Sequence, residues 1–370
     1  MTRSLSIALI TYSTKPRGGV VHTLHLAEAL AAAGARVTVW SLARAGDVGF
    51  FRAVDPAVTV RLVDFPTVDG ESVTERIVRS IEGMRAAVRL DDYDIVHAQD
   101  CISANAVGTC IRTVHHLDTF TTPILVECHE KAIVTPYAHI CVSQAVADEV
   151  HHGWGVSPTV IPNGVAAGRF AAAAADTEEA TRARRRWTDR LGDYVLAVGG
   201  IEPRKGTIDL VRAVARLQTI RPEMSLVIAG GETLFDYRDY RSEFESTCAA
   251  FNVDPVVLGA VDDDELPALV AACRVFAFPS TKEGFGLAAM EALAAGRPVV
   301  ARDLPVLREV FGDTVRYAGD VTGLAQELGD ACQHPSTTRD RAAGQAVAAA
   351  LTWDVAARAH LDFYRRHPRP

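Results

Sequence analysis

At 370 residues, the chain exceeds the length at which a single hydrophobic core usually stops growing, so we expect two domains. Its net charge of −8 argues against broad electrostatic binding to nucleic acid or to acidic membranes. No apolar run approaches the roughly 20 residues that span a bilayer, and the seven scattered cysteines argue against a disulfide framework or a zinc site. We therefore expect a cytoplasmic enzyme with no stable membrane insertion.

Short apolar runs alternate with amphipathic segments along the first half, which is typical of parallel α/β sheets. The first run leads into a glycine loop at Gly18 and Gly19 and then a helix from about His22 to Ala33, with Gly34 as its C-terminal cap. Another helix is expected to begin near Pro123. The strands expected here are Leu5–Tyr12, Arg36–Ser41, Thr59–Val63, Ile95–Ala98, Cys110–His115, His139–Val142 and Thr159–Ile161.

A second alternating series follows an alanine-rich stretch. We expect residues 164–179 to form a nearly featureless crossing between the domains. The last segment, 353–366, is predicted to be an amphipathic helix with Val355, Ala359 and Phe363 as its apolar positions. The five strands expected to complete a second sheet are Tyr194–Val198, Ser225–Ala229, Val256–Leu258, Val275–Phe278 and Pro298–Ala301.

The loop after Tyr194–Val198 has the sequence GGIEPRKG and carries the adjacent cations Arg204 and Lys205. Ligands of open parallel sheets bind beyond the carboxyl ends of the strands, which is where this loop lies. A diphosphate requires compensating positive charge, and each charge-assisted hydrogen bond contributes roughly 1.5–3 kcal/mol. The alternative is a solvated basic turn. The position of the loop favours phosphate binding.

The segment EGFGLAAMEAL follows Val275–Phe278 and is the most specific signal in the chain. In one continuous helix, Glu283 and Glu291 would lie about 80° apart and would not share a face. Glycines 284 and 286 interrupt such a helix, so Glu283 is predicted on a loop and the helix near Gly286. The amides of Phe285, Gly286 and Leu287 would then point at an anion. The alternative is a capped surface helix with incidental carboxylates.

Imidazoles end a strand in the first half. His115 and His116 follow one apolar run, with Asp118 just beyond, and one imidazole is predicted to bind a sugar hydroxyl or to transfer a proton. Successive strand residues face opposite sides, so only one is expected at the ligand, and a purely structural pair is the alternative. His97 and Asp100 are weaker candidates of the same kind. The His and Cys clusters have no partner at metal spacing, so no metal is expected.

These motifs together resemble the family-four (group 1) retaining glycosyltransferases. The resemblance covers nearly the whole chain and rests on the order of the Gly18–Gly19 loop, VHH, ICVS, VIPNG, EPRKG, FPST and EGFGLAAME. It implies the GT-B fold, with two Rossmann-like α/β domains whose parallel sheets face a central cleft. The implied divisions are an acceptor-side domain (1–165), a nucleotide-sugar donor domain (166–350) and a C-terminal helix (351–370) that packs back on the first domain.

The resemblance also implies roles for single residues. Arg204 and Lys205 match a pair that binds the donor phosphates, Glu283 lies near the donor sugar, and Glu291 binds the nucleotide ribose. His115 matches a strand-end histidine, although the aspartate that usually follows it is His116 here. Catalytic roles are thus expected for His115, Arg204, Lys205 and Glu283. The expected substrate-binding residues are Gly18, Gly19, His116, Asn163, Phe285, Gly286, Leu287 and Glu291.

The implied reaction moves a hexosyl group from a UDP-, GDP- or ADP-sugar to an acceptor, without a cofactor. The acceptor, a carbohydrate, a lipid or a small molecule, attacks the face from which the diphosphate leaves, and the leaving phosphate helps to remove its proton. One rival is another GT-B enzyme, a nucleotide-sugar epimerase or a phosphorylase. A second rival is a non-catalytic nucleotide-sugar-binding protein.

Overall fold

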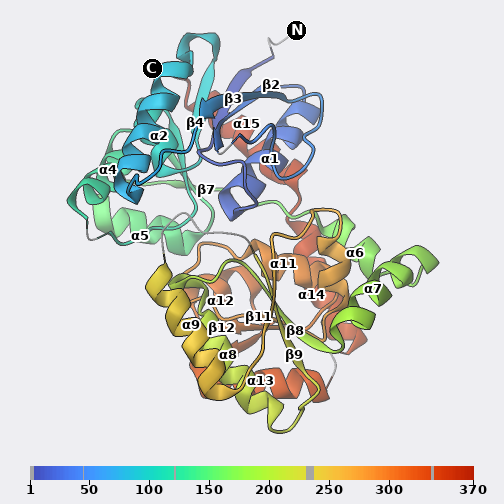
Figure 1. Cartoon of the computed structure of the whole chain (residues 1–370). Helices are drawn as coiled ribbons and strands as arrows, with labels where there is room; N and C mark the ends of the chain where they lie inside the picture. The colour runs from blue at the N-terminus through green and yellow to red at the C-terminus, as the bar shows by residue number, and fades with distance from the viewer. Residues whose placement is uncertain (1–3, 45, 121, 231–236, 335–336) are drawn as a thin grey trace. The chain divides into compact units, whose positions relative to one another are not determined.

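The computed structural model describes residues 4–44, 46–120, 122–230, 237–334 and 337–370. The chain divides into two compact units, which we treat separately (Figure 1). Unit 1 comprises Met1–Gly164 and Trp353–Pro370, and unit 2 comprises Val165–Thr352. Each unit is a parallel sheet covered by helices, so the predicted α/β class with two parallel sheets is confirmed. Within the described residues, no helix is both long enough and apolar enough to span a membrane.

Unit 1 contains a seven-stranded sheet of order β3-β2-β1-β4-β5-β6-β7. Its strands are β1 (Ser6–Ile10), β2 (Arg36–Arg44), β3 (Thr59–Phe65), β4 (Ile95–Ala98), β5 (Ile111–Val114), β6 (Ala138–Cys141) and β7 (Thr159–Val160). Its helices are α1 (Gly18–Ala32), α2 (Val73–Ala87), the 3₁₀ turn η1 (Leu90–Asp92), α3 (Cys101–Val107), α4 (Pro123–Val134), α5 (Gln144–Trp154) and α15 (Trp353–Arg366). The last helix of the chain, α15, packs against the first, α1 (Figure 1).

Two helices of unit 1 differ from the sequence prediction. Helix α1 begins at Gly18 rather than near His22, so the glycine pair forms its first turn instead of a loop. Burial of Val20, which is 1% exposed, offsets the roughly 1 kcal/mol by which each glycine disfavours a helix. Helix α15 has the predicted bounds, and the predicted Phe363 is buried, but the rest of its buried face differs from the prediction. Val355 is 49% exposed, whereas His360 and Tyr364 are among its buried side chains.

Unit 2 contains a six-stranded sheet of order β10-β9-β8-β11-β12-β13. Its strands are β8 (Tyr194–Val198), β9 (Ser225–Ala229), β10 (Val256–Gly259), β11 (Val275–Phe278), β12 (Val299–Arg302) and β13 (Arg316–Ala318). Its helices are α6 (Ala167–Ala174), α7 (Glu178–Leu191), the 3₁₀ turn η2 (Pro203–Lys205), α8 (Thr207–Gln218), α9 (Arg238–Phe251), α10 (Leu266–Ala272), α11 (Leu287–Ala294), α12 (Pro305–Phe311), α13 (Val321–Gln333) and α14 (Thr338–Ala350).

The sequence prediction was wrong at two places in unit 2. The expected five-stranded sheet has a sixth strand, β13, whose three residues carry no apolar pattern long enough to be recognised. The stretch 164–179 is not featureless, because it contains α6 and the start of α7. Alanine has the highest helix propensity of all residues, so a run of alanines that includes one buried anchor, Phe170, folds as a helix.

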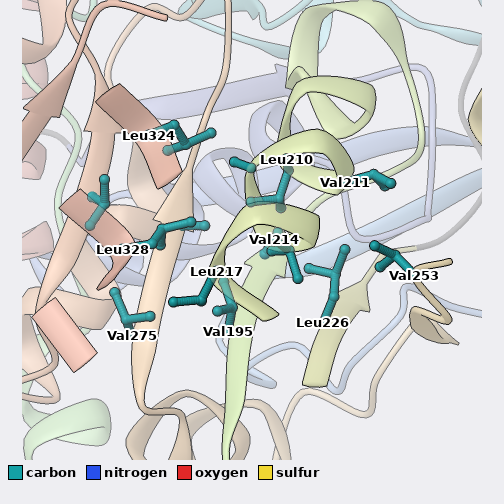
Figure 2. Packing of buried hydrophobic residues seen from close by; sticks show 14 of the residues in the cluster. Val195, Leu210, Val211, Val214, Leu217, Leu226, Val253, Val275, Leu324 and Leu328 are labelled. Atoms are coloured by element: carbon teal, nitrogen blue, oxygen red, sulfur yellow. The ribbon is translucent and has the colours of Figure 1, made fainter. Parts of the chain in front are cut away.

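Alternation along the strands of unit 2 sends side chains to both faces of the sheet. Val195 and Val275 point into a core shared with α8 and α13, where they meet Leu217 and Leu328 (Figure 2). Tyr194 belongs to the opposite face, and its hydroxyl donates to the Leu269 carbonyl of α10 at 2.6 Å. Helices on both faces thus fix the sheet, and the loops at the strand ends are held by a rigid layer.

Candidate functional site

The loops that follow β8 and β11 lie side by side. These strands pair in parallel, with Val275 opposite Val195, so their carboxyl ends meet at one edge of the sheet. The Thr281 amide donates to the Arg204 carbonyl at 2.8 Å, which joins the two loops. The structure therefore brings together Arg204, Lys205 and Glu283, which the sequence predicted separately on two segments about 80 positions apart.

These residues form a cluster of alternating charge, which we call the donor cluster and define as Glu202, Arg204, Lys205 and Glu283. Glu283 Oε1 accepts hydrogen bonds from Lys205 Nζ and, at 3.1 Å, from Arg204 Nη1. Arg204 Nη2 also lies 2.8 Å from Glu202 Oε1. The Glu283 side chain is only 10% exposed, which strengthens these contacts relative to a surface pair. The predicted cations thus already have carboxylate partners, and an entering phosphate has to compete with Glu283.

Gly206 holds the basic loop against the next one. It adopts φ +62°, and a Cβ atom there would lie 2.3 Å from the Pro279 carbonyl oxygen. Only glycine combines this left-handed conformation with so close an approach of two backbones. The Lys205 ammonium also lies 5.3 Å from the centre of the Phe278 ring, within cation–π range. The backbone and the aromatic ring together fix where the lysine charge is presented.

Helix α11 begins beside the donor cluster. Gly286 is its N-cap at φ +97°, no side chain caps the helix, and Phe285 is buried at 3% exposure. The helix starts at Leu287, as predicted from the glycines. Its first amides have no partners within the helix and carry the positive end of the helix dipole. An anion bound near Glu283 would meet these amides as well as the two cations.

Glu291 lies in α11 next to charged groups of another segment. Burial raises its pKa to about 8, Arg169 opposes that rise, and Asp263 adds to it. Arg169 Nη1 in turn lies 2.8 Å from Asp263 Oδ2. At neutral pH the Glu291 carboxyl is therefore largely protonated and able to donate a hydrogen bond. Arg169 was not predicted from the sequence, because it lies in the alanine-rich stretch and gives no local signal.

In unit 1, His115 lies directly after β5 and packs on α1. A Cβ atom at Gly19 would lie 3.6 Å from His115 Cδ2, so the imidazole covers this glycine, while the space around Gly18 is open. The His115 ring also meets the His22 ring edge-on, with a centroid distance of 4.7 Å. Burial lowers the pKa of both histidines well below the ordinary value, so both are neutral. The structure thus joins Gly19 and His115 at one site.

Asn163 and Gln99 contact the paired imidazoles of His22 and His115. His22 Nδ1 lies 2.8 Å from Asn163 Oδ1, which places the predicted Asn163 beside the imidazole pair. His115 Nε2 lies 3.4 Å from Gln99 Oε1. The sequence analysis did not select His22 or Gln99, because only the packing of α1 and β4 against β5 brings them to His115.

The other candidates of unit 1, His116, His97 and Asp100, do not contact Gly19. His116 is 31% exposed and lies 3.4 Å from Asp118, so it does not share the Gly19 contact. His97 is fully buried, 2.8 Å from the Tyr364 hydroxyl and 2.7 Å from that of Thr113. Asp100 caps α3 by accepting from the Ser103 amide. These contacts give His97 and Asp100 structural roles. Among the residues that the structure describes, no group of three or more His, Cys, Asp or Glu side chains is placed to hold a metal ion.

Comparison with known families assigns both halves of the chain. The family described as "Glycosyl transferases group 1" matches residues 182–334, and "Glycosyltransferase Family 4" matches residues 16–169. The chain belongs to the group 1 glycosyltransferases. The first match contains the whole donor cluster and Glu291, and the second contains Gly19, His22 and His115.

Curated relatives agree with this glycosyltransferase assignment, and a solved structure shares the fold. The chain is 29% identical to the glycogen synthase of Mycobacterium tuberculosis, over 94% of this chain and 92% of that protein. It is 26% identical to the MMP alpha-(1->4)-mannosyltransferase of Mycolicibacterium hassiacum, over 90% of this chain and 91% of that protein. The structure of Anabaena Alr3699/HepE in complex with UDP-glucose superimposes with a TM-score of 0.73 and 18% identity, over 98% of this chain and 100% of that one. The glycosyltransferase therefore has the GT-B fold.

Proposed function

We propose that this glycosyltransferase moves a hexosyl group from a UDP-, GDP- or ADP-sugar to an acceptor, with retention of the anomeric configuration and without a metal ion. The donor cluster carries the proposal, because its two cations lie at the carboxyl edge of one sheet, next to the N-terminus of α11. The similarity to both a glycogen synthase and a mannosyltransferase supports the general term hexosyl.

The donor diphosphate would enter by exchanging partners with Glu283. Arg204 and Lys205 both contact Glu283 Oε1 in the structure. A diphosphate carries more negative charge than one carboxylate, so it competes for these cations and releases Glu283. The freed carboxylate then faces the sugar, where it can accept hydrogen bonds from hydroxyls or stabilise positive charge at the anomeric carbon.

The leaving group requires charge compensation, which this chain can supply from its own groups. As the bond from the anomeric carbon to the phosphate oxygen breaks, negative charge grows on the diphosphate beside Lys205, Arg204 and the amides of α11. The acceptor oxygen forms the new bond, and its proton passes to the departing phosphate oxygen. His115, which is neutral, can both donate to and accept from a sugar hydroxyl.

Glu291 and His116 are proposed to bind hydroxyl groups of the substrates. A protonated Glu291 can donate one hydrogen bond to a ribose oxygen and accept another from a ribose hydroxyl. His116, 31% exposed, is proposed to bind acceptor or sugar hydroxyls rather than to take part in proton transfer.

Turnover of a panel of nucleotide sugars by the purified protein tests this function. We expect transfer or slow hydrolysis with at least one of them, and a product with the anomeric configuration of the donor. Lys205→Ala and Glu283→Gln should each lower kcat/KM by about 100-fold or more. The matched control is Arg221→Ala, which removes an arginine paired with Glu223 at 2.7 Å outside the donor cluster. Equal turnover in all four proteins would refute the assignment, and free sugar phosphate or an epimerised donor would indicate a phosphorylase or an epimerase.

A further inference from the structure

A cavity of about 240 Å³ lies at the edge of the unit 2 sheet opposite the donor cluster. Asp193, Arg274 and Pro298 line it and directly precede β8, β11 and β12, which are neighbouring strands. The donor cluster instead follows the carboxyl ends of β8 and β11. Five residues of β8 separate the two edges by roughly 16 Å, since a strand rises about 3.3 Å per residue. The cavity is therefore distinct from the donor site.

Three arginines and one acidic residue line this cavity. Arg274, Arg297 and Arg341 contribute positive charge, and Asp193 contributes the opposing negative charge. Within the described part of the chain, none of the three arginines forms a salt bridge with a carboxylate. Each guanidinium uses one nitrogen on a neutral acceptor: Cys332 O at 2.6 Å, Cys273 O at 3.4 Å and Thr338 Oγ1 at 3.5 Å, respectively.

The neutral contacts leave most of the hydrogen-bonding capacity unused. A guanidinium has five N–H donors, and the Nε atoms of Arg274 and Arg297 are buried without a partner. Capping of backbone carbonyls accounts for one nitrogen of each of these two residues. It does not account for Arg341, which comes from α14 and whose Cδ would lie 3.7 Å from a Cβ atom at the neighbouring Gly296. Three segments of unit 2, the residues before β11, the residues before β12, and helix α14, thus bring guanidinium groups to one cavity.

The electrostatics of the cavity favour an anion. Burial lowers the pKa of Arg297, and the positive charges of Arg184, Arg341 and Arg274 lower it further. Within the described residues, Arg297 has no carboxylate partner that would offset this repulsion. An anion placed among the guanidinium groups would relieve it and fill the unused donors at the same time.

We propose that this arginine cavity binds a small phosphate-bearing anion at a second site of the enzyme. Phosphate matches the planar fork of arginine, which forms two parallel hydrogen bonds to its oxygens. The volume far exceeds the roughly 10–15 Å³ that one water requires, so a phosphate group fits with part of the molecule that carries it. Inorganic phosphate and a sugar phosphate share this chemistry.

Calorimetric titration of the full chain with inorganic phosphate and with glucose 6-phosphate, at constant ionic strength, tests the proposal. We expect saturable binding of at least one, and tighter binding of glucose 6-phosphate if a sugar phosphate is the ligand. Arg341→Gln should weaken binding about tenfold, because it removes one charge-assisted contact from an exposed position without disturbing the core. Arg297→Gln should do the same, with its melting temperature measured to confirm folding.

Two control variants separate this site from other phosphate binding. Arg339→Gln removes the same charge from an exposed position on the same helix but outside the cavity lining, and should leave the affinity unchanged. Lys205→Ala alters the donor cluster and should also leave it unchanged. Absence of saturable binding would overturn the proposal. So would binding that Lys205→Ala abolishes and Arg341→Gln preserves, because the phosphate would then occupy the donor cluster.

Discussion

Replacing Gly206 by alanine tests whether the donor cluster depends on the close approach of two loops. The new Cβ would lie 2.3 Å from the Pro279 carbonyl oxygen, whereas carbon and oxygen atoms normally approach to about 3.3 Å. The loops must therefore separate by about 1 Å. The left-handed backbone adds about 1–2 kcal/mol for any residue with a Cβ. We expect a total destabilisation of about 3 kcal/mol.

Gly155→Ala is the matched control for this substitution. Gly155 also has a left-handed conformation, at φ +68°, but a Cβ there would meet open space. It should show the backbone cost alone, about 1 kcal/mol. For units of this size, 1 kcal/mol corresponds to a melting-temperature shift of about 2–4 °C, so calorimetry should show roughly 3 °C for Gly155→Ala and 6–12 °C for Gly206→Ala.

Activity distinguishes the two variants further. A displacement of about 1 Å next to Lys205 should lower kcat/KM by about 100-fold in Gly206→Ala, whereas Gly155→Ala should retain its turnover. Equal melting temperatures and equal turnover for the two variants would refute the reasoning, because the contact between the loops would then have no effect on the donor cluster.

Three further substitutions or treatments have defined outcomes. Glu291→Gln should be increasingly more stable than the wild type as the pH rises from 4.5 to 8. A carboxyl whose pKa is raised on folding makes the wild type lose stability over this window, by up to about 5 kcal/mol. A stability difference between the two proteins that does not depend on pH in thermal melts would contradict the raised pKa. Gly164→Ala should destabilise unit 1 by about 3 kcal/mol in a denaturant titration, since its Cβ would lie 2.5 Å from Trp353. Gly168→Ala is the control, because a Cβ atom at this position of α6 would meet open space, and it should be neutral or stabilising in the same titration. Dialysis against EDTA should leave kcat/KM within about twofold of the untreated enzyme, since the donor cluster supplies the charge compensation, and a loss of activity that Mn²⁺ restores would show that a metal is required.

The fold was largely predictable because many of its strands are short, mainly apolar runs between polar or glycine-containing segments. Strands β4, β8, β9 and β11 have the predicted bounds, as expected for segments buried on both faces of a parallel sheet. Strand β13 escaped prediction because its three residues depend on pairing with β12 rather than on a pattern of their own. Helix α6 escaped prediction because an alanine run was interpreted as a linker, although alanine favours helices.

The candidate site was predictable only as far as local position determines it. The rule that ligands lie at the carboxyl ends of strands selected Arg204, Lys205 and Glu283 as candidates, and the structure places them on the loops that follow the paired strands β8 and β11. The pairing of Glu283 with both cations could not be predicted, since it depends on the packing of two loops. The contact of His22 with His115, and the position of Arg169 near Glu291, depend in the same way on packing between distant segments.

Calorimetric titration of UDP, GDP and ADP into the wild-type protein and Lys205→Ala tests the central claim most directly. We expect saturable binding of at least one nucleoside diphosphate to the wild type. We also expect at least about tenfold weaker binding to Lys205→Ala, because this variant loses one charge-assisted hydrogen bond. Unchanged affinity in Lys205→Ala, with Arg221→Ala as the reference for a neutral substitution, would contradict the claim that the donor cluster binds the diphosphate.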